Sequence, residues 1–253
     1  MKYIQVAMMI LGWMAGQTAS ATNLPFKLPP PKCFQKFILE TPLPLNLKTD
    51  PCLQYREDYN DYALKQGFTG YELASDEPVM RPVSIYYKFI APLADHSNDF
   101  VFLLQWSGGG TGFFSSLVIL NHQNNILKLK QTLASGDRCF GSIDKAWVKD
   151  NQIFYQQKVT PYQFMAERFP KLPKLNALED CAVWCLGVFN RTKNTIESFS
   201  LSNVPAYEGS NVPQRCMNNI IKQAAASTRT FDKRQLKKLQ LQIKSACFSG
   251  NKK

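Results

Sequence analysis

Histidine is scarce in this sequence, with two copies, His96 and His122, among 253 residues. Both lie in polar segments that are typical of solvated loops. The cysteines include no pair with C-x-x-C spacing, so the sequence lacks the ligand set of a zinc site. No Lys-Ser or Lys-Thr pair follows a glycine-rich segment, as it would in a phosphate-binding loop. We therefore expect no metal ion and no cofactor.

The sequence also lacks the G-x-S-x-G motif on which many serine hydrolases carry their nucleophile. Ser107, His96 and Asp99 supply the residue types of a serine triad, but nothing in their spacing supports one. A protein that binds a partner without chemistry is the favoured interpretation. The alternatives are a secreted hydrolase that uses Ser107 or a free cysteine, and a structural or interaction component of the cell envelope.

Apolar runs long enough to cross a membrane are missing beyond the N-terminus, where the best run, Phe113–Leu120, has eight residues and includes two serines. The N-terminus itself is different. Lys2 precedes a short apolar run, and Ala19-Ser20-Ala21 has the small residues of a cleavage site. This layout predicts a secretory signal peptide over residues 1–21. We expect a mature chain that is exported to the periplasm or the extracellular medium.

Cysteine is plentiful, and all seven copies lie after the predicted cleavage site. Exported chains usually oxidise such cysteines, so we expect up to three disulfides and one unpaired thiol. A buried, inert thiol is the favoured interpretation, whereas a reactive thiol or a disulfide-linked dimer remains open. The candidates for disulfides are Cys33, Cys52, Cys139, Cys181, Cys185, Cys216 and Cys247.

The positions of the cysteines along the chain reduce the number of plausible disulfide pairings. Cys216 and Cys247 open and close a predicted helical hairpin, so we expect them to meet at one end of it. That bridge would contribute about 3–4 kcal/mol in the chain-entropy model. Cys181 and Cys185 are too far apart to bridge each other on a strand, so separate partners are favoured, with Cys139 one candidate.

Three regions are expected after the signal peptide, at residues 22–82, 83–202 and 203–253. The first holds nine prolines, which favour extended loops, and a Cys33–Cys52 bridge could staple it. In the second, apolar and polar side chains alternate at the two-residue period of a strand. The expected strands are Val83–Phe89, Phe100–Trp106, Phe113–Leu120, Ile126–Leu133, Ile143–Lys149, Gln152–Val159, Ala182–Phe189 and Thr195–Leu201, with short helices near Leu53–Lys65 and over Pro161–Phe169.

The third region has the apolar spacing of two amphipathic helices, with stripes that include Met217 and Ile221 in the first helix and Leu239 and Ile243 in the second. Thr230 or Asp232 is expected to cap the second helix. The three regions together predict an α+β fold. A disulfide-stapled antiparallel β meander, as a sheet or a sandwich, carries a C-terminal α-helical hairpin.

Positive charge is concentrated in that hairpin. Residues 214–253 hold ten basic side chains and one acid, so they carry +9, whereas the chain between them and the signal peptide carries +1. Such a cluster attracts anionic lipid, polysaccharide or acidic protein, and we do not expect specific nucleic-acid binding. Taken alone, such a run of charge is more often a solvated face, a role that long Lys side chains suit. The predicted contacts are Lys222, Arg229, Lys233, Arg234, Lys237, Lys238 and Lys244, of which Lys237 and Lys238 flank the apolar stripe as in a helix at a lipid interface.

The segment Gly108–Gly112 is the densest glycine cluster in the sequence. It resembles the start of the tubulin-type GTPase signature, but bulky Phe113 and Phe114 stand where that signature needs small residues. The favoured interpretation is a turn between two strands. A bare backbone at Gly108, Gly109 and Gly110 would also let a ligand approach closely, so this loop is a second candidate contact surface.

Overall fold

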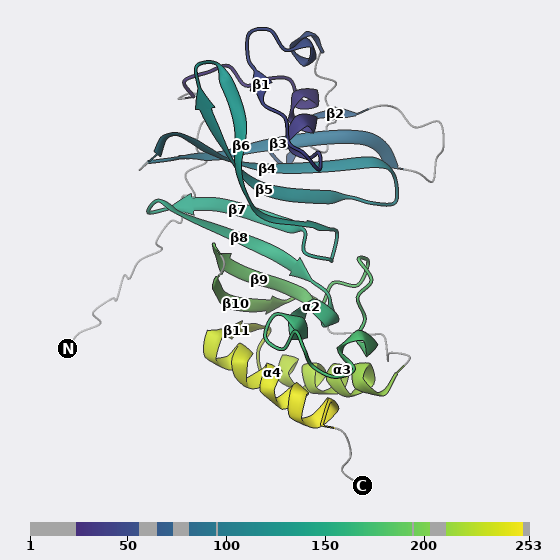
Figure 1. The fold of residues 1–253 in the computed structure, drawn as a ribbon. Helices are drawn as coiled ribbons and strands as arrows, with labels where there is room; N and C mark the ends of the chain where they lie inside the picture. The colour runs from purple at the N-terminus through teal and green to yellow at the C-terminus, as the bar shows by residue number, and fades with distance from the viewer. Residues whose placement is uncertain are drawn as a thin grey trace, which may run out of the picture.

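The computed structural model describes residues 24–55, 65–72, 81–94, 96–193, 195–202 and 211–249. The predicted signal peptide and most of the helix expected near 53–65 lie outside these residues. Two antiparallel sheets follow each other along the long axis of the molecule, and two helices cover the far end (Figure 1). The predicted α+β class, with an antiparallel meander and a C-terminal helical pair, is confirmed.

The first sheet is built from neighbouring hairpins. Its strands stand in the order β1-β6-β5-β4-β3-β2, and every pair is antiparallel. The strands are β1 (Leu45–Asn46), β2 (Thr69–Glu72), β3 (Arg81–Leu93), β4 (His96–Gly110), β5 (Phe114–Gln123) and β6 (Ile126–Asp137). The long β3–β6 meander was predicted, whereas β1 and β2 join its two edges from the proline-rich segment.

The second sheet repeats the plan with five strands in the order β11-β10-β9-β8-β7, again antiparallel. A short helix, α2 (Pro161–Ala166), and a 3-10 turn, η4 (Leu175–Ala177), separate β8 from β9. The helices α3 (Val212–Ala225) and α4 (Lys233–Cys247) flank the last strand. The strands are β7 (Ile143–Lys149), β8 (Gln152–Val159), β9 (Gly187–Thr192), β10 (Thr195–Leu201) and β11 (Thr230–Asp232).

The first sheet is covered on both faces, which explains why β5 is buried continuously from Ser115 to Leu120. Val118 packs in a cluster with Phe34, which belongs to the 3-10 helix η2 (Pro31–Phe37) of the N-terminal segment. Leu117 points to the other face and packs in a cluster with Tyr155 of β8. A strand that is buried on both faces has a run of apolar residues in its sequence, instead of alternating apolar and polar residues. Phe113–Leu120 is such a run.

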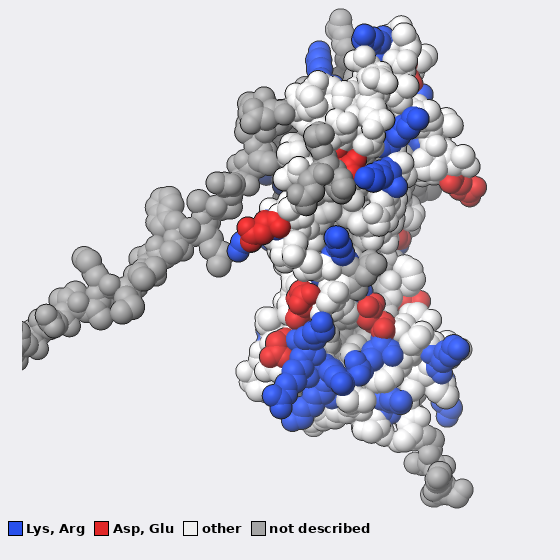
Figure 2. All heavy atoms as spheres, turned by 60° about the vertical axis from the view of Figure 1, so that its left-hand side comes forward, with Lys and Arg blue, Asp and Glu red and all other residues white. Residues whose placement is uncertain are grey.

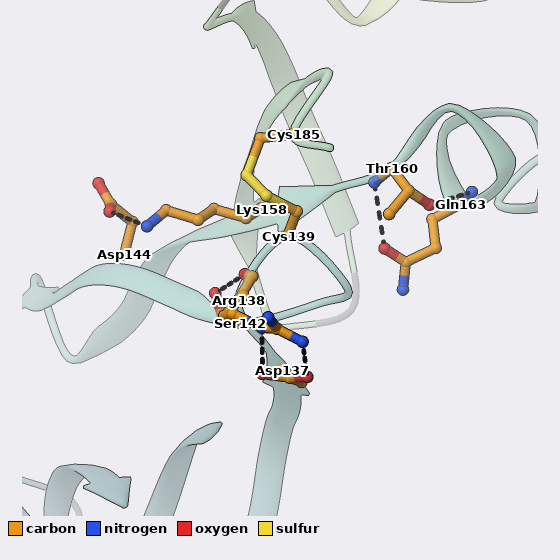
Figure 3. Close-up of a disulfide and its surroundings, with 9 residues drawn as sticks. All are labelled: Asp137, Arg138, Cys139, Ser142, Asp144, Lys158, Thr160, Gln163 and Cys185. Atoms are coloured by element: carbon orange, nitrogen blue, oxygen red, sulfur yellow. Dashed lines mark hydrogen bonds and ion pairs between the residues drawn. A yellow bond between two sulfur atoms is a disulfide. The ribbon is translucent and has the colours of Figure 1, made fainter. Parts of the chain in front are cut away.

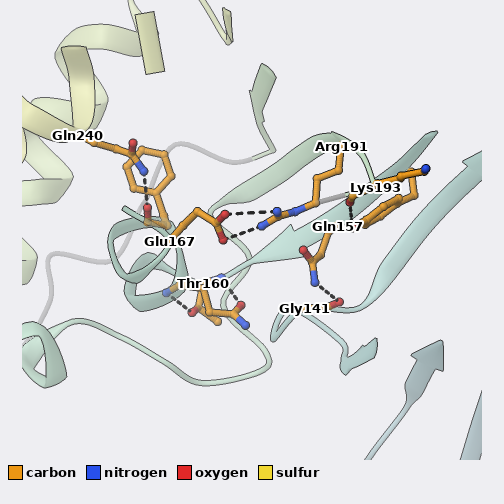
Figure 4. Close-up of polar contacts among 10 residues, drawn as sticks. Gly141, Gln157, Thr160, Glu167, Arg191, Lys193 and Gln240 are labelled. Atoms are coloured by element: carbon orange, nitrogen blue, oxygen red, sulfur yellow. Dashed lines mark hydrogen bonds and ion pairs between the residues drawn. The ribbon is translucent and has the colours of Figure 1, made fainter. Parts of the chain in front are cut away.

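The second sheet forms a separate core with the helices. Phe199 of β10 is fully buried there, with its ring centroid 4.8 Å from that of Phe164 in α2. Met217 of α3 and Ile243 of α4, both expected from the apolar stripes, lie in the same core. The buried amide of Gln240 donates a 2.6 Å hydrogen bond to the carbonyl oxygen of Phe164 (Figure 4). This bond fixes the register of α4 on α2.

The starts of the helices follow the capping chemistry of the sequence. The carboxylate of Asp232 accepts a 2.7 Å hydrogen bond from the backbone N–H of Gln235, whose side-chain oxygen accepts from the N–H of Asp232 at 3.0 Å. Thr160 and Gln163 form the same reciprocal capping box at α2 (Figure 3). Asp232 is therefore the cap of α4, one of the two predicted candidates.

Three disulfides staple the fold. Cys33–Cys52 and Cys216–Cys247 are confirmed, with Cα atoms 5.3 Å and 5.6 Å apart. The third bridge joins Cys139 to Cys185, with Cα atoms 4.7 Å apart, and confirms that Cys181 and Cys185 do not pair with each other. The thiol of Cys181 remains free and exposed. The expectation of a buried odd cysteine is wrong, because the disulfide beside it holds this segment at the surface.

The strand expected over Ala182–Phe189 begins only at Gly187. The preceding residues form a turn instead, in which the N–H of Trp184 donates to the carbonyl oxygen of Cys181 at 2.9 Å. Val183 is 57% exposed although it is apolar. The bridge to Cys139 holds this segment away from the sheet, so its strand-like composition does not decide its structure.

His122 also differs from the expectation of a solvated turn. It lies near the end of β5, and its ring packs 4.5 Å from that of Phe26 in the N-terminal segment. The nitrogen Nε2 is buried and has no hydrogen-bond partner among the described residues. Burial lowers the pKa of His122 from its ordinary value. This histidine therefore contributes to packing of the N-terminal segment.

Candidate functional site

The basic residues of the C-terminal region lie at exposed positions of α3 and α4, except Arg229, which lies in the link between α3 and β11. Both helices bury one apolar stripe, with Ile221, Leu239 and Ile243 in the core beneath them. Because that stripe faces inward, the charged positions between its members face solvent. We call the exposed basic set the basic helical face. Its members are Lys222, Arg229, Lys233, Arg234, Lys237, Lys238 and Lys244, all exposed as predicted.

Figure 2 shows blue side chains gathered over this end of the molecule, with mixed colours over the sheets. Lys222 lies in the last turn of α3, and Lys233 begins α4, so the two helices present charge at neighbouring ends. The Cys216–Cys247 bridge closes the opposite end of the pair. The surface is thus a rigid one, set by helix packing and by a covalent link.

The basic helical face has little internal compensation. None of its members takes part in the ion pairs found within the described ranges, which join other residues. The acid of this segment, Asp232, uses its carboxylate to cap α4. Lys244 has an aromatic neighbour, because its Nζ lies 4.7 Å from the centre of the Phe169 ring. The positive potential is therefore available to a partner.

The placement of Lys233 and Arg234 is unfavourable for the helix itself. They occupy the first two positions of α4, and its first turn contains no acid. The N-terminal end of a helix carries a partial positive charge that favours acidic side chains. Two cations at this point raise the local positive potential at a small cost in stability.

This unfavourable placement predicts that reversing one charge at the start of α4 stabilises the fold. Replacing Lys233 with glutamate is expected to stabilise the fold by about 0.5 kcal/mol, because an acid replaces a cation at the helix start. Lys238→Glu, more than a turn further along, is the matched control and should leave stability almost unchanged. Chemical unfolding midpoints measure both. Equal midpoints for the two variants would contradict this description of the α4 terminus.

The glycine segment lies far from the basic helical face. Gly108, Gly109 and Gly110 continue β4 rather than forming the predicted turn, and they pair with the start of β3. Gly109 and Gly110 have φ values of 87° and 83°, which side chains rarely adopt. No atom lies within 4 Å of a Cβ built on Gly108. The two predicted contact surfaces therefore belong to different sheets and do not form one site.

The fold does not bring together Ser107, His96 and Asp99, the three residues that have the residue types of a serine triad. Ser107 and His96 lie at opposite ends of β4, about 36 Å apart along a strand that rises ~3.3 Å per residue. Ser107 is 2% exposed. The carboxylate of Asp99 accepts a hydrogen bond from Asn121 at 2.7 Å and forms an ion pair with Lys130. A Ser-His-Asp arrangement of these three residues is incompatible with this geometry.

The remaining candidate chemistry concerns cysteine. Cys139 lies in the turn after β6, as the sequence predicted, and Arg138 beside it forms a local ion pair with Asp137 at 3.1 Å. The exposed thiol of Cys181 lies in the segment that this turn is bonded to. The sequence analysis named Cys139 as one candidate partner for Cys181 or Cys185, but it did not predict that Cys181 is exposed.

Two general properties complete the description. Within the described ranges, no helix is both long and apolar enough to span a bilayer. The same residues include no group of three or more side chains that could hold a metal ion. Comparison of the chain with family models, with curated proteins and with solved structures finds no match to any of them.

Proposed function

We propose that the chain is an exported, non-enzymatic binding protein that holds an acidic polysaccharide on its basic helical face. The observation that carries the proposal is the exposed, uncompensated charge of α4 and the end of α3. Lys233, Arg234, Lys237 and Lys238 fall within two turns of one helix and lack ion-pair partners in the described structure. Such a cluster raises the local concentration of polyanions.

A linear polyanion suits this face because its charges can follow the helix. From Arg234 to Lys244 the face extends about 15 Å along α4, at a rise of ~1.5 Å per residue. Neutralising several charges of one chain releases its condensed counterions together, and this release favours binding most strongly for closely spaced charges. Since the helices are held by a packed core and a disulfide, little conformational entropy is lost on binding.

Insertion into a lipid surface is the less favoured alternative. A helix that lies in a membrane interface buries its apolar face among the lipids. Leu236, Leu239 and Ile243 of α4 are instead at most 4% exposed within the protein core. Only electrostatic adsorption would remain, and it gives about 1 kcal/mol for each basic residue near an anionic surface.

The disulfides support the part of the proposal that concerns compartment. Three bridges in one chain are typical of oxidising environments, outside the reducing cytosol. The signal peptide at residues 1–21 remains a prediction from the sequence. Intact mass of the native protein tests it: a chain that begins near Thr22 supports export, and a chain that retains Met1 with seven free thiols contradicts it.

A ligand comparison tests the class of partner. The mature chain is immobilised, and heparin, neutral dextran, poly-glutamate and vesicles of anionic lipid are passed over it at about 0.15 M salt. We expect the tightest binding for heparin and none for dextran. Deleting the helical region is not a useful control, because Met217 and Ile243 belong to the core. Preference for vesicles or for poly-glutamate over heparin would overturn the polysaccharide assignment.

A further inference from the structure

Cys139, Cys181 and Cys185 belong to one junction between two parts of the chain, in which Cys139 is buried and Cys181 is exposed. Cys139 lies in the turn between β6 and β7 and is bridged to Cys185, just before β9 (Figure 3). The backbone N–H of Cys139 also donates a 2.8 Å hydrogen bond to the carbonyl oxygen of Ala182. The turn is therefore attached to the 181–185 segment twice, once by sulfur and once by the main chain.

Cys181 is next to both attachments. Ala182, which accepts from Cys139, is its immediate neighbour in the chain, and the hydrogen bond from Trp184 N–H to its own carbonyl oxygen, 2.9 Å long, folds the segment back toward Cys185. Its thiol is free and exposed. A nucleophile of the type that attacks disulfides thus lies beside a disulfide.

The turn that carries Cys139 also carries a pair of opposite charges. Arg138 precedes Cys139 and donates hydrogen bonds to the carboxylate of Asp137, both 3.1 Å long. These bonds raise the pKa of the guanidinium, and negative charge on Cys181 raises it further. The thiolate form of a cysteine is the species that attacks sulfur, and Arg138 is the cation of this turn.

We propose that Cys139, Cys181 and Cys185 form a thiol–disulfide exchange site in which Cys181 takes over the bond to Cys139. The thiolate Sγ of Cys181 attacks Sγ of Cys139, a Cys139–Cys181 bond forms, and the Cys139–Cys185 bond breaks. Cys185 leaves as a thiolate and takes up the proton that Cys181 gave up. One disulfide and one thiol are present before and after the step, so it needs no external oxidant or reductant.

The exchange preserves the architecture. In both states the turn after β6 is linked to the segment before β9, and the loop closed through Cys181 is only four residues shorter than the loop closed through Cys185. In the chain-entropy model this changes the stabilisation very little. A Cys181–Cys185 bond would instead release the turn and close a loop of a few residues. The two Cys139-linked states are therefore similar in free energy.

The consequence is a change at the surface. Val183 and Trp184 stand between the two exchanging cysteines and are 57% and 47% exposed. Moving the bond from Cys185 to Cys181 transfers the fixed point of this segment from one side of the exposed pair to the other. The site therefore gives the molecule two covalent forms that differ in the tethering of one apolar segment.

Peptide mapping tests the proposal on the full mature chain. The protein is incubated at about pH 8, where an ordinary thiol is partly ionised, then quenched in acid, alkylated and digested without reduction. Trypsin releases Cys139 by cleavage after Arg138, and chymotrypsin cleavage after Trp184 separates Cys181 from Cys185. We expect Cys139 linked to each of the two, in amounts within about tenfold of each other.

Two variants make the outcome decisive. Cys185→Ser, refolded in a glutathione redox buffer, is expected to form the Cys139–Cys181 bond and to show no free thiol. Cys181→Ser is the control: it is expected to keep the original Cys139–Cys185 bond and also to show no free thiol. Circular dichroism reports whether each variant is folded. If the wild type yields only the Cys139–Cys185 peptide and folded Cys185→Ser keeps two free thiols, the exchange site does not exist. If Cys185→Ser does not fold, the peptide ratio of the wild type alone decides.

Discussion

Retention on immobilised heparin is expected to fall more than about a hundredfold when four cations of α4 are reversed to glutamate. Juxtaposing like charges across an interface costs several kcal/mol, and about 2.7 kcal/mol already corresponds to a hundredfold loss of affinity. The helix itself should persist, because none of the four side chains is in the core. The exchanged residues are Lys233, Arg234, Lys237 and Lys238.

The matched control changes net charge by the same amount elsewhere. It replaces four exposed lysines on or beside the sheets with glutamate. These lysines also lack ion-pair partners in the described structure. If binding depends on the basic helical face, the control keeps most of the affinity and the α4 variant does not. Equal losses would show that only total charge matters and would contradict the proposed site. The control residues are Lys48, Lys128, Lys145 and Lys149.

The second large effect concerns stability. Phe199→Ala is expected to lower the free energy of unfolding by about 3–5 kcal/mol, the range for removing a buried phenylalanine. Its ring lies 5.5 Å from that of Phe189 in β9 and 6.1 Å from that of Phe231 in β11, so it packs against side chains of both neighbouring strands. Urea unfolding followed by circular dichroism measures the loss.

Phe114→Ala is the matched control for that substitution. Phe114 is 36% exposed at the start of β5 and stacks on Trp106 at 5.5 Å. Because its removal leaves no closed cavity, we expect a loss of no more than about 1 kcal/mol. Similar losses for the two variants would mean that Phe199 is not at the centre of the second core.

Local patterns were enough to predict the regular part of the fold. The bounds of Ile143–Lys149, Gln152–Val159 and Thr195–Leu201 agree with β7, β8 and β10 residue for residue. These strands alternate apolar and polar residues over much of their length, and β7 and β8 are joined by a turn at Asp150 and Asn151, which adopt positive φ. Both signals depend on neighbours in the chain and are therefore visible in the sequence.

Long-range contacts determine the short strands that the sequence did not predict. β1, β2 and β11 are two to four residues long and exist because a distant strand offers its edge. Gly70 in β2 illustrates the point, since a Cβ there would come within 2.0 Å of the Tyr86 ring. Such a close approach is fixed by the partner strand, and a single glycine in the sequence does not reveal it.

In the candidate site, too, the features set by local sequence patterns were predicted and those set by tertiary contacts were not. Exposure of the basic helical face followed from the 3.6-residue spacing of its apolar neighbours, and the Cys216–Cys247 bridge followed from the hairpin. The contact of Lys244 with Phe169 did not follow from the sequence, because tertiary packing brings α4 against the segment after α2. The exposure of Cys181 likewise depends on a bridge whose partner, Cys139, belongs to another hairpin.

The most direct measurement is the heparin affinity of the unmodified mature chain over a range of salt concentrations. Binding by the basic helical face releases counterions, so the logarithm of the association constant should fall linearly with the logarithm of salt concentration. With five or six of its cations engaged, the expected slope is about −4 to −5. A slope near zero, or no binding at about 0.05 M salt, would contradict the account.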